Sequence, residues 1–267
     1  MIYQVHDWDD AYANGAHIAD GDSYPERWTK AAAAFRDRHS RRSMTGGDLF
    51  EPDSAPRGLM VFIHGGYWMK TDPSVWSHLA QGALAAGWAV LLPAYTLAPQ
   101  ARIAQMTVQV AQQIVMAADQ IDGPIALTGH SAGGHLAARM VCDDATLPKA
   151  VTDRITSCVP ISPLTDLRSI MRTSMNDTLR LDLPEALSES PALLQPVQGI
   201  PVTTWVGGAE RPEFIRHARL LADVWAGLGS ATECVIDPGL HHFDVIDALS
   251  RADSPLMQRL LGYSASR

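Results

Sequence analysis

The chain has 267 residues, of which 46% are hydrophobic and 19% are charged, and its formal net charge is −8. These proportions are typical of a globular protein and exclude a disordered chain, which would combine low hydrophobicity with high charge. The acidic balance argues against nucleic acid or an anionic membrane as the main partner, because both carry negative charge. We therefore expect a small-molecule ligand that is not strongly anionic.

Cysteines and the N-terminal sequence bear on the compartment. Cys142, Cys158 and Cys234 are widely spaced and show no C-x-x-C or Cys/His ligand spacing, so we expect reduced, mostly buried thiols. The stretch MIYQVHDWDD lacks the basic segment and apolar run of a signal peptide. No apolar run approaches the roughly 20 residues that span a bilayer. These features predict a cytoplasmic protein without a membrane partner, and they leave both a monomer and a homodimer open.

The predicted elements alternate between strands and helices along the chain. Residues 1–57 are expected to hold a short helix near 25–38, followed by a loop or edge strands. Short buried strands are expected at 58–64, 88–93, 124–129, 155–161, 201–206 and 232–236, and helices near 75–86, 101–119, 131–143, 213–228 and 243–262. Such alternation predicts a single α/β domain with a mainly parallel sheet covered by helices on both faces.

Residues 163–199 interrupt the alternation. They contain prolines at 163, 184, 191 and 196, with scattered Leu and Met between them. We expect this stretch to be a small helical insertion over the sheet, a cap or lid rather than a second domain.

The sharpest motif is Gly129-His130-Ser131-Ala132-Gly133, a G-x-S-x-G between a predicted strand and a predicted helix. A serine nucleophile in this setting occupies a strained strand-to-helix turn, where side chains at the flanking glycines would clash. The N-terminus of the following helix favours developing negative charge. We therefore predict Ser131 as a nucleophile; the alternative is that the glycines merely permit close helix packing.

A second motif, HGGYW at 64–68, follows the strand predicted at 58–64. Acyl transfer needs backbone N–H donors for the tetrahedral oxyanion, and small residues let such donors approach closely. We predict an oxyanion hole formed by the amides of Gly65, Gly66 and Ala132. His64 is expected to order this loop by hydrogen bonding rather than transfer protons.

Aromatic and imidazole side chains next to these two motifs are candidates for the substrate pocket. Tyr67 and Trp68 either wall the pocket beside the reacting carbonyl or belong to the core. The candidate pocket residues are Tyr67, Trp68, His64 and His130.

A serine nucleophile requires a base and an acid, which follow it in the chain order Ser, Asp/Glu, His in this type of fold. His135 and His217 fall within predicted helices, where a packed or solvated role is expected. The pair His241 and His242 lies on a loop after the last predicted strand, and we predict His242 as the base with His241 in reserve.

The acid is sought on the loop after the strand at 201–206, which reads GGAERPEF. Glu213 begins the next helix, where a carboxylate commonly serves as a cap or terminal charge. Glu210 lies on the loop itself and is our prediction for the acid. Asp166 is the competitor, although it could equally be a helix cap.

Together, HGGYW, GHSAGGHLA, YTLAP at 95–99, PEF at 212–214 and HHFD at 241–244 resemble the kynurenine formamidase (arylformamidase) branch of the α/β-hydrolase superfamily, which is related to hormone-sensitive-lipase-like esterases. The resemblance runs from about residue 58 to 262. It implies an α/β-hydrolase fold with Ser131 as nucleophile, His242 as base and the Gly65 and Gly66 amides in the oxyanion hole. One departure is that the family normally has Asp where this chain has Glu210.

The motifs and the resemblance therefore predict a serine hydrolase of an acyl amide or ester. The resemblance favours an arylformamidase that converts N-formyl-kynurenine to kynurenine and formate, and the alternative is a short-chain carboxylesterase with the same residues. No metal or organic cofactor is needed for this chemistry. A silent ligand-binding module would not require the serine, the base and the oxyanion loop. A metal site at His241, His242 and Asp244 would lack the usual i, i+4 geometry.

Overall fold

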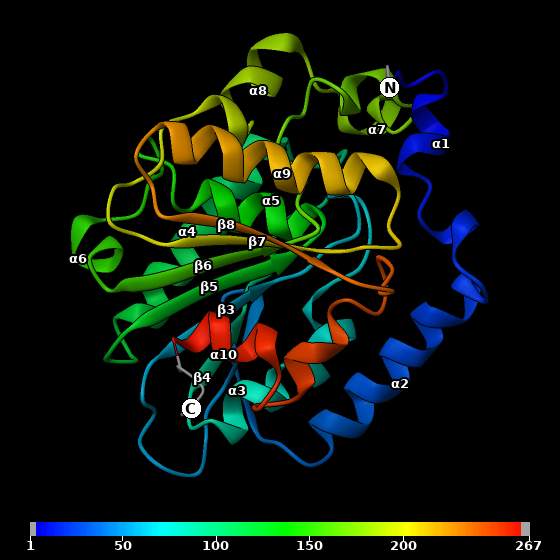
Figure 1. The fold of residues 1–267 in the computed structure, drawn as a ribbon. Helices are drawn as coiled ribbons and strands as arrows, with labels where there is room; N and C mark the ends of the chain where they lie inside the picture. Colours follow the sequence, from blue (N-terminus) through cyan, green and yellow to red (C-terminus); the bar gives the residue numbers. More distant parts are fainter. Residues whose placement is uncertain (1–3, 263–267) are drawn as a thin grey trace.

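One sheet organises the computed structural model, which describes residues 4–262 (Figure 1). Within that range the sheet has eight strands in the order β1-β2-β4-β3-β5-β6-β7-β8. The strands are β1 (Arg41–Met44), β2 (Gly47–Phe50), β3 (Leu59–Ile63), β4 (Ala89–Leu92), β5 (Ile125–His130), β6 (Ile155–Ile161), β7 (Val202–Gly207) and β8 (Thr232–Asp237). Pairing is antiparallel from β1 to β2 and from β2 to β4, and parallel between all other neighbours. The mainly parallel sheet is thus confirmed, and 1–57 supplies its antiparallel edge.

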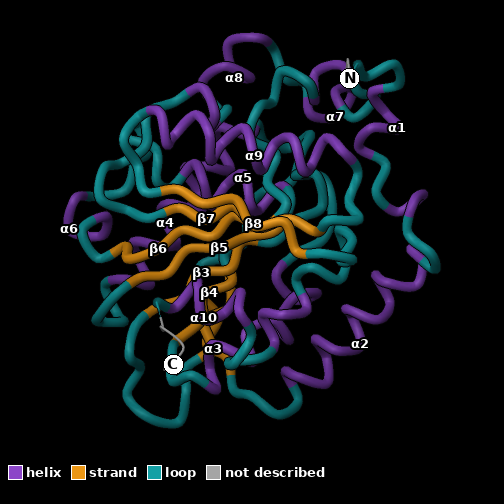
Figure 2. Tube along the Cα trace, in the orientation of Figure 1, coloured by secondary structure: helices purple, strands orange, loops and turns teal. Residues whose placement is uncertain are grey.

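Helices cover both faces of this sheet (Figure 2). The longer ones are α2 (Tyr24–Arg36), α4 (Ile103–Ala118), α5 (Ala132–Arg139), α9 (Pro212–Gly227) and α10 (Pro255–Leu261). The shorter ones are α1 (Trp8–Tyr12), α3 (Gln81–Ala85), α6 (Lys149–Thr152), α7 (Asn176–Leu179) and α8 (Leu183–Ser188), and a 3₁₀ helix at Pro73–Ala80 runs into α3. Further 3₁₀ turns lie at Gly15–His17, Gly21–Ser23, Ile170–Arg172, Pro191–Leu193 and Asp247–Ser250.

The alternation of side chains along β3 divides the interior into two cores. Val61 and Ile63 pack in the core beneath α4, α5 and α9, whereas Met60 and Phe62 pack in the core of α2, α3 and α10. This is the period of two that a strand with both faces buried requires. Every residue of β3 is therefore apolar.

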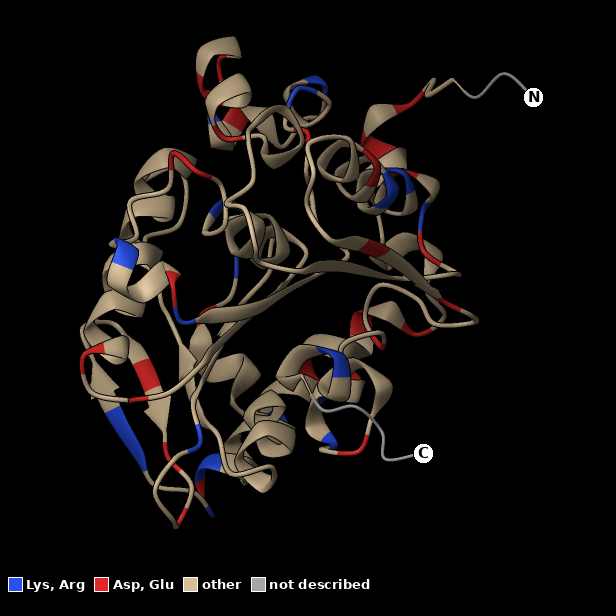
Figure 3. Cartoon of the chain, turned by 60° about the vertical axis from the view of Figure 1, so that its left-hand side comes forward, with Lys and Arg blue, Asp and Glu red and all other residues tan. Residues whose placement is uncertain are grey.

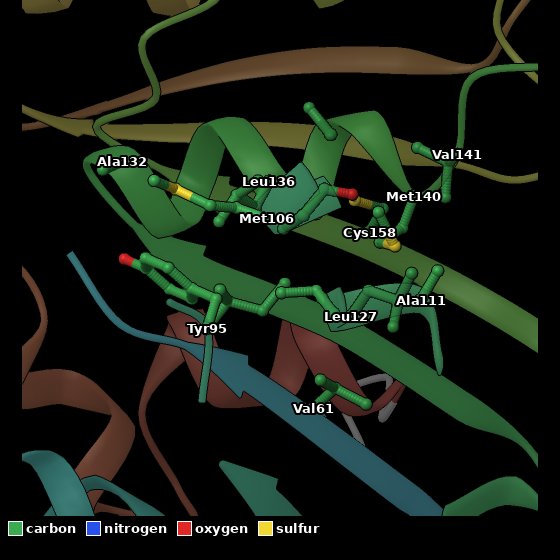
Figure 4. Close-up of a cluster of buried hydrophobic side chains, with 14 of the residues drawn as sticks. Val61, Tyr95, Met106, Ala111, Leu127, Ala132, Leu136, Met140, Val141 and Cys158 are labelled. Carbon is green, nitrogen blue, oxygen red and sulfur yellow. The ribbon is translucent and has the colours of Figure 1, made fainter. Parts of the chain in front are cut away.

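Figure 4 shows part of the first core, between the sheet and α5. Met106 of α4 and Leu136 of α5 pack with Val61 and Leu127 of the strands, and all four are fully buried. Burial of such side chains stabilises by about 1.5–3 kcal/mol each. The helix that follows β5 is thereby held firmly against the sheet.

Most charged residues among those described lie at the periphery. Strands β3 to β7 contain none, and Figure 3 shows acidic and basic residues interspersed over the outer helices and loops. Among residues 4–262, none of the helices has the length and apolar character needed to cross a bilayer. All three cysteines carry free thiols, with Cys142 and Cys158 buried and Cys234 partly buried.

Two predicted helices differ from the structure. The helix expected over 131–143 ends at Arg139, because the next residues pair with another segment: Val197 N–H donates to the Val141 carbonyl at 2.8 Å. The helix expected over 243–262 is divided, since Pro255 lacks an N–H and begins α10 afresh, with Ser254 as its N-cap.

The segment 163–199 folds into short helices, including α7 and α8, that lie on the α9 side of the sheet (Figure 1). It is tied to its surroundings by backbone and indole hydrogen bonds. The Trp225 indole of α9 donates to the Pro191 carbonyl at 3.1 Å, and Ala192 N–H donates to the Thr165 carbonyl at 3.0 Å. The helical character agrees with expectation, and the role of a lid stays a prediction.

Candidate active site

The turn between β5 and α5 places Ser131 in an unusual backbone conformation. Its φ is 57° and its ψ is −117°, which a non-glycine residue rarely adopts. Flanking glycines make the turn possible: a Cβ on Gly129 would lie 2.2 Å from the Gly133 carbonyl oxygen, and a Cβ on Gly133 would lie 2.0 Å from that of Ile63. The sequence thus requires glycine on both sides of the serine, as the motif predicts.

Two backbone hydrogen bonds hold this turn. Ser131 N–H donates to the Ile161 carbonyl of β6 at 2.9 Å, and the Ser131 carbonyl accepts from His135 N–H at 3.0 Å as α5 begins. Ser131 is only 2% exposed. Strain of this kind persists only where the surroundings enforce it, and it is concentrated at functional sites.

The loop after β3 lies directly beside Ser131. A Cβ on Gly65 would lie 3.2 Å from the Ser131 Cβ and 2.8 Å from the His130 carbonyl oxygen. Gly66 has a φ of 107°, and a Cβ there would lie 2.3 Å from the Lys70 carbonyl oxygen. Glycine is therefore required at both positions, and the backbone of Gly65 lies against the Ser131 side chain.

His64 orders this loop, as expected. The His64 ring stacks on Tyr95 with 4.3 Å between centroids, and its Nδ1 lies 2.9 Å from the Gly65 carbonyl oxygen. The Tyr95 hydroxyl donates to the His64 carbonyl at 2.9 Å. Burial lowers the pKa of His64 to about 4, so the ring is neutral near pH 7. The loop beside Ser131 is thus held by neutral hydrogen bonds.

The two residues predicted as base and acid meet at the carboxyl edge of the sheet. His242 Nδ1 lies 2.6 Å from Glu210 Oε2, and both side chains are almost fully buried. Because a carboxylate only accepts hydrogen bonds, His242 Nδ1 is the donor in this contact. The other Glu210 oxygen, Oε1, accepts from Gly207 N–H at 2.7 Å and from the Ser162 hydroxyl at 2.5 Å.

The loops that carry Glu210 and His242 are joined by backbone hydrogen bonds. Gly208 N–H donates to the Asp237 carbonyl at 2.8 Å, and Ala209 N–H donates to the Leu240 carbonyl at 2.9 Å. Gly207 permits this approach, because a Cβ there would lie 2.3 Å from the Leu240 carbonyl oxygen. Glutamate is one methylene longer than the aspartate expected at this position. The Glu210 side chain fits because it folds back onto its own loop, where Gly207 N–H donates to its Oε1.

Rings surround His242 on more than one side. His130 Nε2 donates to the His242 carbonyl at 2.9 Å, with 4.5 Å between the two ring centroids. Phe214 of α9 lies 4.4 Å from the His242 ring. Burial holds the pKa of His130 well below its usual range, so this ring is neutral. His130 therefore lies directly against His242, and its role as a pocket residue stays a prediction.

The two aromatics of HGGYW have different surroundings. The Tyr67 hydroxyl donates to the Tyr12 carbonyl and accepts from Asn14 Nδ2 at 3.1 Å, and the residue retains some exposure. Trp68 has no exposed surface and packs edge-on against His135 at 5.2 Å within the core. The structure therefore places Trp68 among the core aromatics rather than on a pocket wall.

The competing acids have partners elsewhere. The Asp166 carboxylate is paired with Arg168 at 2.7 Å, and although burial opposes its ionisation, the Arg168 guanidinium holds its pKa below the usual range. Glu213, at the start of α9, bonds Arg216 at 2.7 Å. Neither is the carboxylate that meets His242.

The remaining histidines after Ser131 are also engaged. His135 donates from Nε2 to the Glu189 carbonyl at 2.6 Å, and His217 accepts at Nδ1 from Thr165 N–H at 2.8 Å. His241, the reserve base, pairs through Nε2 with the Tyr24 hydroxyl at 3.1 Å. Across residues 4–262, no group of three or more His, Cys, Asp or Glu could hold a metal ion.

One contact in this site was not foreseen from the sequence, namely that of Ser162 with Glu210. The only signal was its place, directly after the strand predicted at 155–161 and hence at the same sheet edge. A serine there has many other uses, so position alone did not single it out.

Comparisons with known proteins indicate which family this chain is similar to. A family model described as alpha/beta hydrolase fold matches residues 60–243. The chain is 30% identical over 226 residues to a kynurenine formamidase from Danio rerio, covering 80% of this chain and 76% of the relative. It is 29% identical over 215 residues to a kynurenine formamidase from Salmo salar, covering 76% and 71%.

A solved structure is also similar over nearly the whole chain. It is a protein from Silicibacter sp. TM1040, provisionally assigned as a thioesterase, that superposes with a TM-score of 0.90 at 47% identity and covers 95% of this chain and 98% of its own. The resemblance drawn from the motifs is thus confirmed at the level of fold and family.

Proposed function

The chain belongs to the α/β-hydrolase family, and from that membership we propose that it is a serine hydrolase with Ser131 as nucleophile, His242 as base and Glu210 as acid. The observation that carries the proposal is the buried 2.6 Å contact between His242 Nδ1 and Glu210 Oε2. The glycine-flanked, strained turn at Ser131 supports it, since a strained strand-to-helix turn is where this fold carries a serine nucleophile.

In the proposed reaction, His242 Nε2 takes the proton of the Ser131 hydroxyl as Oγ attacks the acyl carbonyl carbon. The carbonyl oxygen becomes an oxyanion that accepts hydrogen bonds from the amides of Gly65, Gly66 and Ala132. Glu210 stabilises the imidazolium, which then protonates the leaving nitrogen or oxygen as its bond to the acyl carbon breaks. Water then attacks the acyl carbon while His242 Nε2 takes its proton. The bond between that carbon and Ser131 Oγ breaks, and the imidazolium returns the proton to Oγ, which releases the acid and free Ser131.

Electrostatics around the serine suit this scheme. Ala132 is the first residue of α5, whose N-terminal amides carry partial positive charge. His64 is neutral at pH 7, so stabilisation of the oxyanion would come from fixed backbone donors rather than from a cation. Preorganised donors of this kind contribute about 3–4 kcal/mol each to lowering such barriers.

We propose N-formyl-kynurenine as the substrate, with formate and kynurenine as the products. The two kynurenine formamidases among the relatives support this choice. A small acyl group such as formyl also suits a serine that is 2% exposed and has the Gly65 backbone against it.

A short-chain carboxylesterase is the second candidate. The relative provisionally assigned as a thioesterase supports an ester-type substrate over an amide, because that protein is 47% identical to this chain and its assignment implies an acyl group on sulfur rather than nitrogen. The same nucleophile, base and oxyanion hole would serve the nitrogen of an amide, the oxygen of an ester and the sulfur of a thioester as leaving atoms.

Steady-state kinetics separate these candidates. Purified protein is assayed on N-formyl-L-kynurenine, a series of p-nitrophenyl acyl esters and short acyl thioesters, with Ser131→Ala as the blank. A kcat/KM of about 10⁴ M⁻¹s⁻¹ or more on the formyl substrate, above that on the esters, supports the formamidase. Turnover of esters or thioesters alone would support the second candidate. Full activity in Ser131→Ala would refute the nucleophile.

A further inference from the structure

The end of β6 lies between the serine turn and the loop of Glu210. The Ile161 carbonyl accepts from Ser131 N–H at 2.9 Å, and the next residue, Ser162, donates its own N–H to the Trp205 carbonyl of β7 at 2.7 Å. Ser162 is therefore fixed to the two strands whose ends carry the proposed nucleophile and acid.

The hydroxyl of Ser162 is directed at the acid. It is fully buried and donates to Glu210 Oε1 at 2.5 Å, while Oε2 of the same carboxylate meets His242 Nδ1 at 2.6 Å. The donor must be the serine, because a carboxylate has no hydrogen to give. A hydrogen bond to a charged acceptor is among the stronger ones in proteins.

The backbone of Ser162 is strained in a way that glycine would relieve. Its φ is 47°, in the left-handed region that disfavours residues with a Cβ. Glycine would suit this backbone better but has no hydroxyl. The position thus combines an unfavourable conformation with a side-chain hydroxyl that reaches Glu210 Oε1.

Glutamate has a reason to need this second contact. Compared with aspartate it has one more rotatable bond, so its carboxylate has more orientations available when it is unrestrained. Here the side chain folds back so that Gly207 N–H and the Ser162 hydroxyl both reach Oε1. With Oε1 held at two points, Oε2 is left in one place, against His242.

We propose that Ser162 is a positioning residue, which holds the Glu210 carboxylate in the orientation that orients His242. This inference rests on the proposed serine-hydrolase function. It explains how a glutamate serves where relatives of this type are expected to have an aspartate.

The test compares Ser162→Gly and Ser162→Ala with a control on β6, the strand that ends directly before Ser162, namely Ser157→Ala. Ser157 is also buried, but its hydroxyl bonds the Leu260 carbonyl of α10 on the other side of the sheet. Both Ser162 variants should lower kcat about tenfold to a hundredfold with KM changed less than about threefold, as loss of an outer hydrogen-bond partner does elsewhere. Ser157→Ala should keep the wild-type kcat.

The glycine variant separates positioning from folding. Because glycine relieves the strain at this φ, Ser162→Gly should melt no lower than Ser162→Ala and still lose kcat. Wild-type kcat in Ser162→Gly would overturn the inference while leaving the proposed function intact.

A structural measurement applies even if no substrate is turned over. Crystal structures of the wild type and Ser162→Gly should show Glu210 Oε2 moving away from His242 Nδ1 in the variant. An unchanged contact would overturn the inference. Absence of Ser131-dependent turnover in the wild type would instead count against the proposed function.

Discussion

Replacing Glu210 by glutamine changes one buried oxygen into an amide nitrogen at nearly constant volume. In the wild type, Oε1 receives two donors, Gly207 N–H at 2.7 Å and the Ser162 hydroxyl at 2.5 Å, and Oε2 receives the His242 Nδ1–H. A glutamine has a single acceptor oxygen. That oxygen should remain with the two donors, which leaves the NH₂ group facing His242.

The magnitude follows from the tautomer that results. An NH₂ donor facing His242 favours the ring form with Nδ1 unprotonated and the proton on Nε2, which cannot accept the Ser131 proton. The corresponding asparagine variant in serine proteases lowers kcat by about 10⁴. We expect a loss of about 10³–10⁴, equivalent to about 4–5.5 kcal/mol of transition-state stabilisation.

The assay is kcat and KM on the best substrate of the panel, with Asp166→Asn as the matched control. Asp166 is the alternative acid and is paired with Arg168, so its variant should keep kcat within about threefold. Glu210→Gln should leave KM nearly unchanged, since the geometry of the pocket is kept. Retention of more than a tenth of wild-type kcat in Glu210→Gln would refute this assignment, and a large loss in Asp166→Asn would transfer the acid role.

Two further predictions concern stability. Gly133→Ala should destabilise by more than about 3 kcal/mol, because the new Cβ would lie 2.0 Å from the Ile63 carbonyl oxygen. Gly227→Ala, where nothing lies within 4 Å of the new Cβ, should instead stabilise by up to about 1 kcal/mol, and equal urea midpoints for the two variants would contradict this. Acidification should also destabilise the protein, since burial lowers the pKa of His64 and His217 to about 4 and that of His135 to about 3. The unfolded chain binds these protons below about pH 6.5 and the folded chain does not, so the free energy of unfolding falls as pH drops from 6.5, by at most about 3 kcal/mol for each histidine with a pKa near 4. Urea unfolding between pH 7.5 and 5 measures this, and a flat profile would exclude it.

The strands were predictable because each is a short apolar run bounded by turn residues. β6 occupies 155–161 as expected, and the edges of β3, β4, β5, β7 and β8 differ from expectation by at most one residue. Parallel strands buried on both faces have continuous hydrophobic sequences, so their signal is local. The length of the helix after Ser131 was overestimated. Residues 141–142 pair with 196–197, and no local pattern contains such a long-range contact.

For the candidate site, too, part was predictable from local sequence and part depended on long-range contacts. The sequence by itself determined that Ser131 lies between glycines at a strand-to-helix junction, and that Glu210 and His242 follow later strands of one parallel sheet. Since the carboxyl ends of parallel strands share an edge, these residues were bound to approach one another. Their order along the chain, Ser, Glu, His, is the one expected of a serine hydrolase with this fold.

Only the tertiary structure decided which of several plausible side chains made contact. It placed Glu210, and not Asp166, against His242, left His241 beside Asp244, buried Trp68 in the core and brought Ser162 to Glu210. Hydrogen bonds form over about 3 Å, a distance set by side-chain rotamers and by the packing of segments that lie far apart in the chain. Local sequence patterns therefore identify the carboxyl edge of the sheet as the place where the candidate residues lie, and packing determines which of their atoms come into contact.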